Sequence, residues 1–196
     1  MHRFSILPAG ALLCALLLFS CTTTRDHGAR GTEPSRNIAA SGTKTAEQLT
    51  AFFLAHAPNA DSGTVYQLAS YYIEESQIEG INSDAAFVQM CLETGFLSFG
   101  GLVTPDMHNY CGLGAIDASR PGERFPTMQT GVRAHIQHLQ AYATQTPLKQ
   151  AVVDPRYKYV QPRGKAPTIY ALSGTWAADR EYGQKLDRLL TELARY

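Results

Sequence analysis

A glutamate ends the most apolar helical segment of this chain. Asn82 is a typical helix N-cap, and residues 85–92 after it are almost entirely apolar up to Glu93, Thr94 and Gly95. A helix that is apolar on nearly all faces is expected to be buried. Carboxylates seldom end such a helix, so Glu93 is the first candidate for chemistry.

Two effects are expected to raise the pKa of the Glu93 carboxyl group. Desolvation disfavours its charged form, and the negative end of the helix dipole does the same. A carboxyl group that keeps its proton near neutral pH can donate that proton as a general acid. The alternatives are a surface glutamate in a frayed last turn and a glutamate paired with an arginine.

Three segments, in order, resemble the peptidoglycan β-N-acetylglucosaminidase family, the flagellar-muramidase and autolysin-type glucosaminidases. The catalytic segment of that family resembles residues 88–96, VQMCLETGF: a helix ends in Glu, then Ser or Thr, then Gly, and the glutamate is the general acid. Residues 109–114, NYCGLG, resemble the segment that lines the family's cleft, and residues 176–185, WAADREYGQK, resemble its Asp-x-x-Tyr segment. The resemblance covers roughly residues 65–195.

The resemblance implies a mostly α, lysozyme-like domain with a long loop or small β-lobe over the cleft. It implies an endo-β-N-acetylglucosaminidase that hydrolyses β-1,4 bonds after N-acetylglucosamine in peptidoglycan glycan strands, as a monomer without a cofactor. The site residues that it implies are Glu93, Glu123 and Tyr182 for catalysis, and Asn109, Tyr110 and Gly112 for substrate binding.

The second carboxylate is less clearly marked than the first. The family often has an acidic residue in a flexible lobe some thirty positions after the acid, which selects Glu123, with Asp117 as the other candidate. A tyrosine commonly follows the phenylalanine of this loop in the family, whereas Met128 stands here. An inverting, a retaining and a substrate-assisted mechanism, the last with Tyr182 positioning the substrate's acetamido group, all remain open.

The helices that must position these residues are predicted from apolar periodicity and capping signals. The Gly-rich residues 95–126 between them are expected to form long loops. The expected helix starts are Thr45, with Gln48 completing a capping box, then Asp61 or Ser62, Asn82, Thr127, Pro167 for a short helix, and Asp179 for the last helix.

The N-terminal residues predict export and lipid attachment. Residues 1–20 have the basic start and the short apolar run of a signal peptide, and the run is too short to span a bilayer comfortably. Residues 18–21, LFSC, resemble a bacterial lipoprotein box, in which cleavage precedes a lipid-bearing cysteine, here Cys21. An uncleaved N-terminal anchor is the alternative. We expect a protein of the bacterial cell envelope, held on a membrane on the periplasmic or surface side.

The domain boundaries follow from composition. Residues 21–44 contain no aromatic residue and predict a flexible tether, which leaves residues 45–196 as the glucosaminidase-like catalytic domain. After signal cleavage and lipidation, Cys91 and Cys111 remain, and an exported protein can join them by a disulfide.

Overall composition excludes some classes of function. The formal net charge is +0, which argues against a nucleic-acid-binding protein. His135 and His138 lie three residues apart without an evident third ligand, so no metal site is predicted. Two other functions stay open: a lytic transglycosylase of the same fold, and a glycan-binding lipoprotein without activity.

Replacing Cys21 by serine should abolish lipid labelling and move the protein from the membrane fraction to the soluble fraction, because the serine hydroxyl cannot replace the thiol as the lipid acceptor. Labelled fatty acid incorporation and cell fractionation measure both effects. Cys14→Ser, which falls within the signal segment, should keep both. Unchanged membrane retention of Cys21→Ser would rule out anchoring through this residue.

Overall fold

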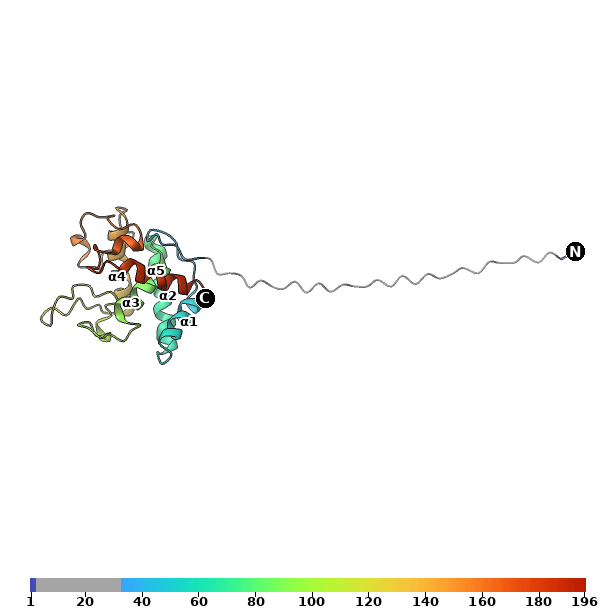
Figure 1. The fold of residues 1–196 in the computed structure, drawn as a ribbon, viewed down its shortest axis with the longest axis horizontal. Coiled ribbons are helices and arrows are strands. Elements are labelled where there is room, and N and C mark those ends of the chain that lie inside the picture. The colour runs from blue at the N-terminus through green and yellow to red at the C-terminus, as the bar shows by residue number, and fades with distance from the viewer. Residues whose placement is uncertain (3–32) are drawn as a thin grey trace.

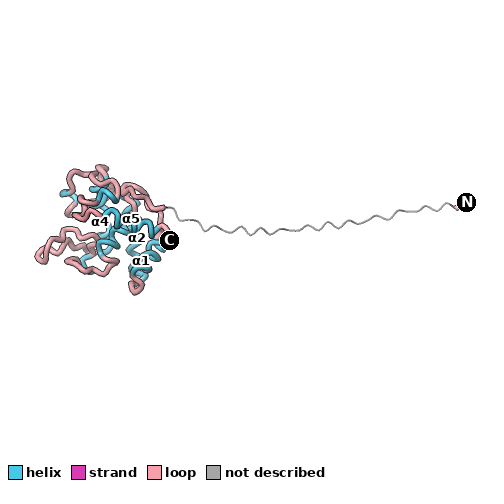
Figure 2. The backbone as a smooth tube through the Cα atoms, viewed as in Figure 1, coloured by secondary structure: helices cyan, strands magenta, loops and turns pink. Residues whose placement is uncertain are grey.

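The computed structural model describes residues 1–2 and 33–196, and five α-helices form the body of the described chain (Figure 1). Figure 2 shows helices joined by long loops in this part of the chain. Its only β-type pairings are isolated bridges. The prediction of a mostly α-helical domain is therefore confirmed. Among the described residues, no helix has both the length and the apolarity needed to cross a bilayer.

The first two helices begin where the capping signals predict. Helix α1 (Ala46–His56) has the capping box of Thr45 and Gln48, with the Thr45 side chain accepting from the Gln48 amide. Helix α2 (Ser62–Glu79) is capped by the Asp61 carboxylate and ends at Gly80. Their apolar faces join the main core.

Helix α3 (Ser83–Thr94) lies at the centre of the domain and contacts each of the other four helices. Every residue from Ser83 to Cys91 is buried, as its almost entirely apolar composition predicts. The Asn82 side chain caps its start, and Gly95 ends it. The helix thus runs from the core to the surface, and Glu93 lies at its surface end.

Helices α4 (Met128–Ala143) and α5 (Tyr182–Leu193) complete the core. Thr127 caps α4 through its side chain, as predicted. The predicted cap of the last helix is wrong, because α5 begins after Glu181, which makes no side-chain capping bond. The Asp179 carboxylate instead accepts from the Glu181 amide and from the Lys185 ammonium group.

Three short 3₁₀ segments stand in the loops: η1 (Pro105–Met107), η2 (Tyr157–Tyr159) and η3 (Ile169–Leu172). The short helix predicted after Pro167 is η3. In Figure 1 the loop of residues 95–126 (green to yellow) and the loop that follows α4 (orange) project from the same side of the helices. The end of α3 lies between them.

Residues 33–44 pack on the domain, so the predicted tether of residues 21–44 is too long. Ile38 is fully buried, and its amide donates to the Pro167 carbonyl at 2.9 Å. The Arg36 guanidinium pairs with Asp187 on α5 at 2.7 Å. The side chains of Asn82 and Asp84 also bind this segment, and composition alone did not reveal these contacts. The rest of the predicted tether, which begins at Cys21, lies outside the described residues, and so does Cys14.

The predicted disulfide is absent from the structure. Cys91 and Cys111 are both free thiols, and both are buried. Cys91 packs in the main core, whereas Cys111 packs in a second cluster with Leu113, Phe125 and Ala134. Burial raises the pKa of each thiol well above its usual value, so both are inert apolar fillers in this arrangement.

Candidate active site

The Glu93 side chain is held by two donors from the C-terminal part of the chain. Tyr182, the first residue of α5, donates its hydroxyl proton to Glu93 Oε1. Trp176 donates its indole Nε1–H to the same oxygen at 2.9 Å. The last turn of α3 and the first turn of α5 therefore meet at one carboxylate oxygen.

The position of Tyr182 depends on the glycine that follows it. A Cβ on Gly183 would lie 2.6 Å from the Tyr170 Cα and 2.8 Å from the Ile169 carbonyl oxygen. Only a glycine lets the first turn of α5 lie directly against η3. This close approach brings the Tyr182 ring, which is 5% exposed, beneath Glu93.

Burial raises the pKa of Glu93, as its place at the end of α3 predicts. The residue as a whole is exposed, yet its carboxyl group lies among protein atoms, and this desolvation is the largest effect. The hydrogen bonds from Tyr182 and Trp176 stabilise the charged form and act in the opposite direction. Desolvation prevails, so the carboxyl group keeps its proton to a higher pH than an ordinary glutamate.

A buried hydrogen-bond chain leads from Glu93 into the core, and we call it the Tyr72–Glu93 chain. Tyr182 accepts from Gln89 Nε2 at 3.0 Å, and Gln89 Oε1 lies 3.1 Å from His135 Nε2. His135 Nδ1 in turn lies 2.8 Å from the Tyr72 hydroxyl. The side chains of the three inner residues, from α2, α3 and α4, are all fully buried.

Only one arrangement of protons satisfies every member of the Tyr72–Glu93 chain. Burial, with a smaller effect of His138, lowers the pKa of His135 to about 3, so its ring is neutral and has one donor and one acceptor. Gln89 Oε1 can only accept, so His135 Nε2 carries the proton and Nδ1 accepts from Tyr72. Each hydrogen bond then points the same way, and Tyr182 is free to donate to Glu93.

Glu93 lines an open cavity of about 180 Å³ between the end of α3 and the loop of residues 95–126. Asn109 and Gly112, two of the predicted substrate-binding residues, also line it. The Asn109 side chain is occupied by backbone groups: it donates to the carbonyls of Leu113 and Glu123 and accepts from the Leu113 amide. Asn109 therefore shapes the cavity wall by holding two loop segments together.

Tyr110 does not reach the cavity. The structure buries this ring in the main core at 4% exposure, and burial raises its pKa. The prediction that Tyr110 lines the cleft is therefore not supported, since an aromatic residue between two glycine-rich turns serves here as packing. Nothing in the sequence separates these two uses of a tyrosine.

The two candidates for a second carboxylate differ in their surroundings. Glu123 lies against the turn at Gly114, where a Cβ would stand 2.9 Å from Glu123 Oε1, and its amide donates to Leu113 at 2.7 Å. Asp117 is exposed in a tight turn, where it pairs with Arg120 at 3.3 Å. Neither lines the Glu93 cavity, but the Glu123 carbonyl accepts a hydrogen bond from the side chain of Asn109, which does line it.

Sequence reasoning missed three residues that support Glu93. Trp176 entered only as the first residue of the segment 176–185, and Gln89 and His135 stand within apolar helical stretches. An amide or imidazole in such a stretch needs a buried partner, which is the one signal that marks these positions. No group of three His, Cys, Asp or Glu side chains in the described ranges is arranged to hold a metal ion.

Comparisons with known proteins bear on the family of this chain. Residues 69–195 match the model of the glucosaminidase family, described as mannosyl-glycoprotein endo-beta-N-acetylglucosaminidase. The match includes α3, α4 and α5 and every residue that contacts Glu93. An uncharacterized protein of Borreliella burgdorferi is 45% identical over 150 residues, which make up 76% of this chain and 73% of that protein. No solved structure matches the chain.

Replacing Tyr182 by phenylalanine should raise the pKa of Glu93 further, because it removes a hydrogen bond that stabilises the carboxylate. A carbon-13 NMR titration of the Glu93 carboxyl carbon measures the change directly. Tyr66→Phe is the matched control, since it removes another tyrosine–glutamate hydrogen bond, to Glu47 on the surface, and should leave the Glu93 titration unaltered. A lower or unchanged Glu93 pKa in Tyr182→Phe would contradict the arrangement described.

Proposed function

Since this chain belongs to the glucosaminidase family, we propose that it is a glycoside hydrolase that cleaves β-1,4 bonds after N-acetylglucosamine in peptidoglycan. The mostly helical fold agrees with the lysozyme-like domain that the resemblance implies. One observation carries the proposal: a carboxyl group with a raised pKa lines an open cavity and is held in place by Tyr182 and Trp176.

The hydrogen bonds of Glu93 define where its proton resides. Oε1 accepts from both Tyr182 and Trp176, whereas Oε2 has no hydrogen-bond partner among the described side chains. An oxygen that already accepts two donors is a poor place for a proton, so the acidic proton sits on Oε2. That oxygen is free to meet the glycosidic oxygen of a bound glycan.

In the proposed reaction Glu93 donates the Oε2 proton to the glycosidic oxygen as the bond to the anomeric carbon breaks. The departing sugar leaves as an alcohol, and Glu93 becomes a carboxylate. The hydrogen bonds from Tyr182 and Trp176 then stabilise the new negative charge, because both favour the ionised form. A water molecule completes the reaction at the anomeric carbon and loses its proton to a base.

Two groups can assist that water. Glu123 is the protein base of an inverting route, in which the two carboxyl groups stand about 6.5–9.5 Å apart with water between them. In the alternative, the substrate's own acetamido oxygen, positioned by Tyr182, attacks the anomeric carbon as the glycosidic bond breaks. Water then opens the ring so formed, and its proton passes to the Glu93 carboxylate. Glu123 lies on a loop tied to the cavity wall by Asn109, which supports the first route.

The same proposal includes the location of the enzyme. The signal-like residues 1–20 and Cys21 support a protein held on a membrane of the bacterial envelope by its N-terminal lipid. Its partners there are the glycan strands of the cell wall, which the monomer approaches with its loop side.

Glu93→Gln should lower the rate of glycan cleavage by about 10²- to 10⁴-fold, because the amide has no transferable proton. It should keep the fold, since the amide oxygen still accepts from Tyr182 and Trp176. The assay follows new reducing ends from purified peptidoglycan and identifies the terminal sugar by mass spectrometry.

The exposed Glu74→Gln carries the same charge change on α2 and should retain full activity. Activity of a folded Glu93→Gln within tenfold of the unaltered protein would refute the role of Glu93. A terminal N-acetylglucosamine is expected, whereas an anhydro-muramyl end would identify a lytic transglycosylase.

Glu123→Gln should lower kcat by about 10²-fold or more if Glu123 is the base, and the product should form with inverted anomeric configuration. Proton NMR of the freshly released reducing end measures the configuration. Asp117→Asn, in the exposed turn nearby, should have little effect. A loss below tenfold, together with strong impairment in Tyr182→Phe, would transfer the role to the acetamido group of the substrate.

A further inference from the structure

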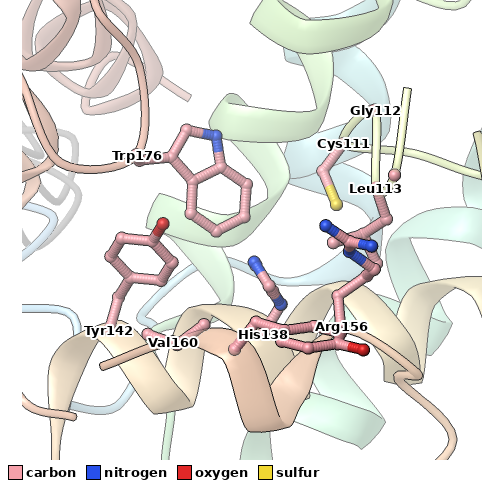
Figure 3. Close-up of a pocket in the computed structure, with 10 residues that line it drawn as sticks. Cys111, Gly112, Leu113, His138, Tyr142, Arg156, Val160 and Trp176 are labelled. Atoms are coloured by element: carbon pink, nitrogen blue, oxygen red, sulfur yellow. The ribbon is translucent and has the colours of Figure 1, made fainter. Parts of the chain in front are cut away.

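A second cavity adjoins the site on the other side of Trp176. Its volume is about 280 Å³, near the lower limit of about 300 Å³ for small-molecule sites. Gly112 lines both cavities, and Trp176 lines this one while it donates to Glu93. Figure 3 shows the cavity residues, with Trp176 and Tyr142 on one side of the view and Arg156 on the other. The second cavity is thus next to the cavity that Glu93 lines.

Arg156 contributes an unpaired cation to this cavity. Within residues 33–196 its guanidinium makes no hydrogen bond or ion pair. Its recorded contact is with the Tyr159 ring, whose centroid lies 4.9 Å from the guanidinium carbon. The Lys158 ammonium lies 5.1 Å from the centroid of the same ring, so two cations contact Tyr159, which lines the cavity. An arginine that stacks on an aromatic ring keeps its fork of N–H donors free for an anion.

The carboxylate nearest in sequence is turned away from that guanidinium. Asp154 is 1% exposed, and its Oδ2 lies 2.7 Å from His138 Nδ1. Its Oδ1 accepts from the Arg156 backbone amide at 2.8 Å. Asp154 therefore fixes the backbone that carries Arg156 and orients His138, another cavity residue, without neutralising the guanidinium.

The segment that carries Arg156 is held firmly on α4. The Gln137 side chain, which is fully buried, accepts from the amides of Val153 and Asp154 at 2.8 and 3.2 Å. The guanidinium thus extends from a backbone that the core has already ordered. Preorganised donors lose less entropy when they bind a ligand, which favours a binding role for this arginine.

We propose that the second cavity, which Arg156 lines, is a subsite for a carboxylate carried by the glycan. The inference rests on the proposed function, and it adds a preference for acidic over neutral glycans. A carboxylate matches the guanidinium fork through two parallel hydrogen bonds. Tyr142 and Trp176 offer apolar faces to the sugar that carries it. Peptidoglycan has two such sources: the lactyl group of its muramic acid, once the peptide is removed, and the stem peptide.

The test compares three glycans of equal length: a neutral chitin oligosaccharide, a peptidoglycan glycan stripped of peptide, and one with its stem peptides. Dissociation constants are measured in the Glu93→Gln background, so that hydrolysis does not interfere and an inactive enzyme leaves the test intact. Arg156→Gln should weaken binding of an acidic glycan by about tenfold or more, as expected for a lost charge-assisted hydrogen bond. The preference of the protein for acidic glycans over chitin should fall by the same factor.

Arg156→Lys should show an intermediate loss, because lysine keeps the charge without the fork. Arg188→Gln, an exposed position on α5, removes the same charge elsewhere and should leave the preference intact. The glycan whose binding weakens most in Arg156→Gln identifies the source of the carboxylate. The stripped glycan would indicate the lactyl carboxylate, and the peptide-bearing glycan would indicate the stem peptide.

Equal weakening for chitin and both acidic glycans in Arg156→Gln would overturn the subsite, as would an equal effect of Arg188→Gln or no binding of any glycan. Cleavage assays of the unaltered protein separate the two proposals. If the unaltered protein cleaves glycan and its preference for acidic glycans is unchanged in Arg156→Gln, only the subsite is overturned. If the unaltered protein cleaves no glycan, the proposed function is overturned.

Discussion

The structure depends on satisfying the polar groups that α3 carries through an apolar core. Gln89 is fully buried on the central helix, and an amide without partners there would cost about 1–3 kcal/mol. The Tyr72–Glu93 chain removes that cost by joining four helices through one line of hydrogen bonds. Because the line ends on Glu93, the packing of α2, α4 and α5 around α3 is also what orients the acid.

This arrangement divides the molecule into a helical part and a loop part. The helices supply a rigid acid and its support, whereas the loops of residues 95–126 and 144–168 supply the walls of the two cavities. Trp176 links these two parts, since its indole N–H holds Glu93 and its ring packs on His138 and Tyr142. Under the proposed function and subsite, Trp176 would serve both catalysis and recognition, and the loops would meet the groups that differ between substrates.

Local signals in the sequence predicted most of the helical frame, the place of Glu93 at the end of α3 and the raised pKa of its carboxyl group. Capping side chains such as Thr45, Asn82 and Thr127 act within one turn, so spacing alone reveals them. Contacts over long sequence distances were not predictable. Trp176 reaches Glu93 across the whole fold, Tyr110 turns inward, and the two thiols separate into different clusters, because each outcome depends on how the loops fold back. Glu123 does not line the Glu93 cavity, although its backbone carbonyl accepts from Asn109, which does.

If Cys21 carries a lipid, as proposed, the packing of residues 33–44 limits how far the domain can reach from the membrane. Contact with the domain begins in the first described residues after Glu33, where Arg36 pairs with Asp187 on α5, rather than at residue 45. With lipid on Cys21, only twelve residue steps join bilayer and enzyme, and a fully extended chain of that length spans about 40 Å. A tether ending at residue 44 would have allowed about twice that span. The domain would then reach only the layer of the cell wall that lies next to its own membrane.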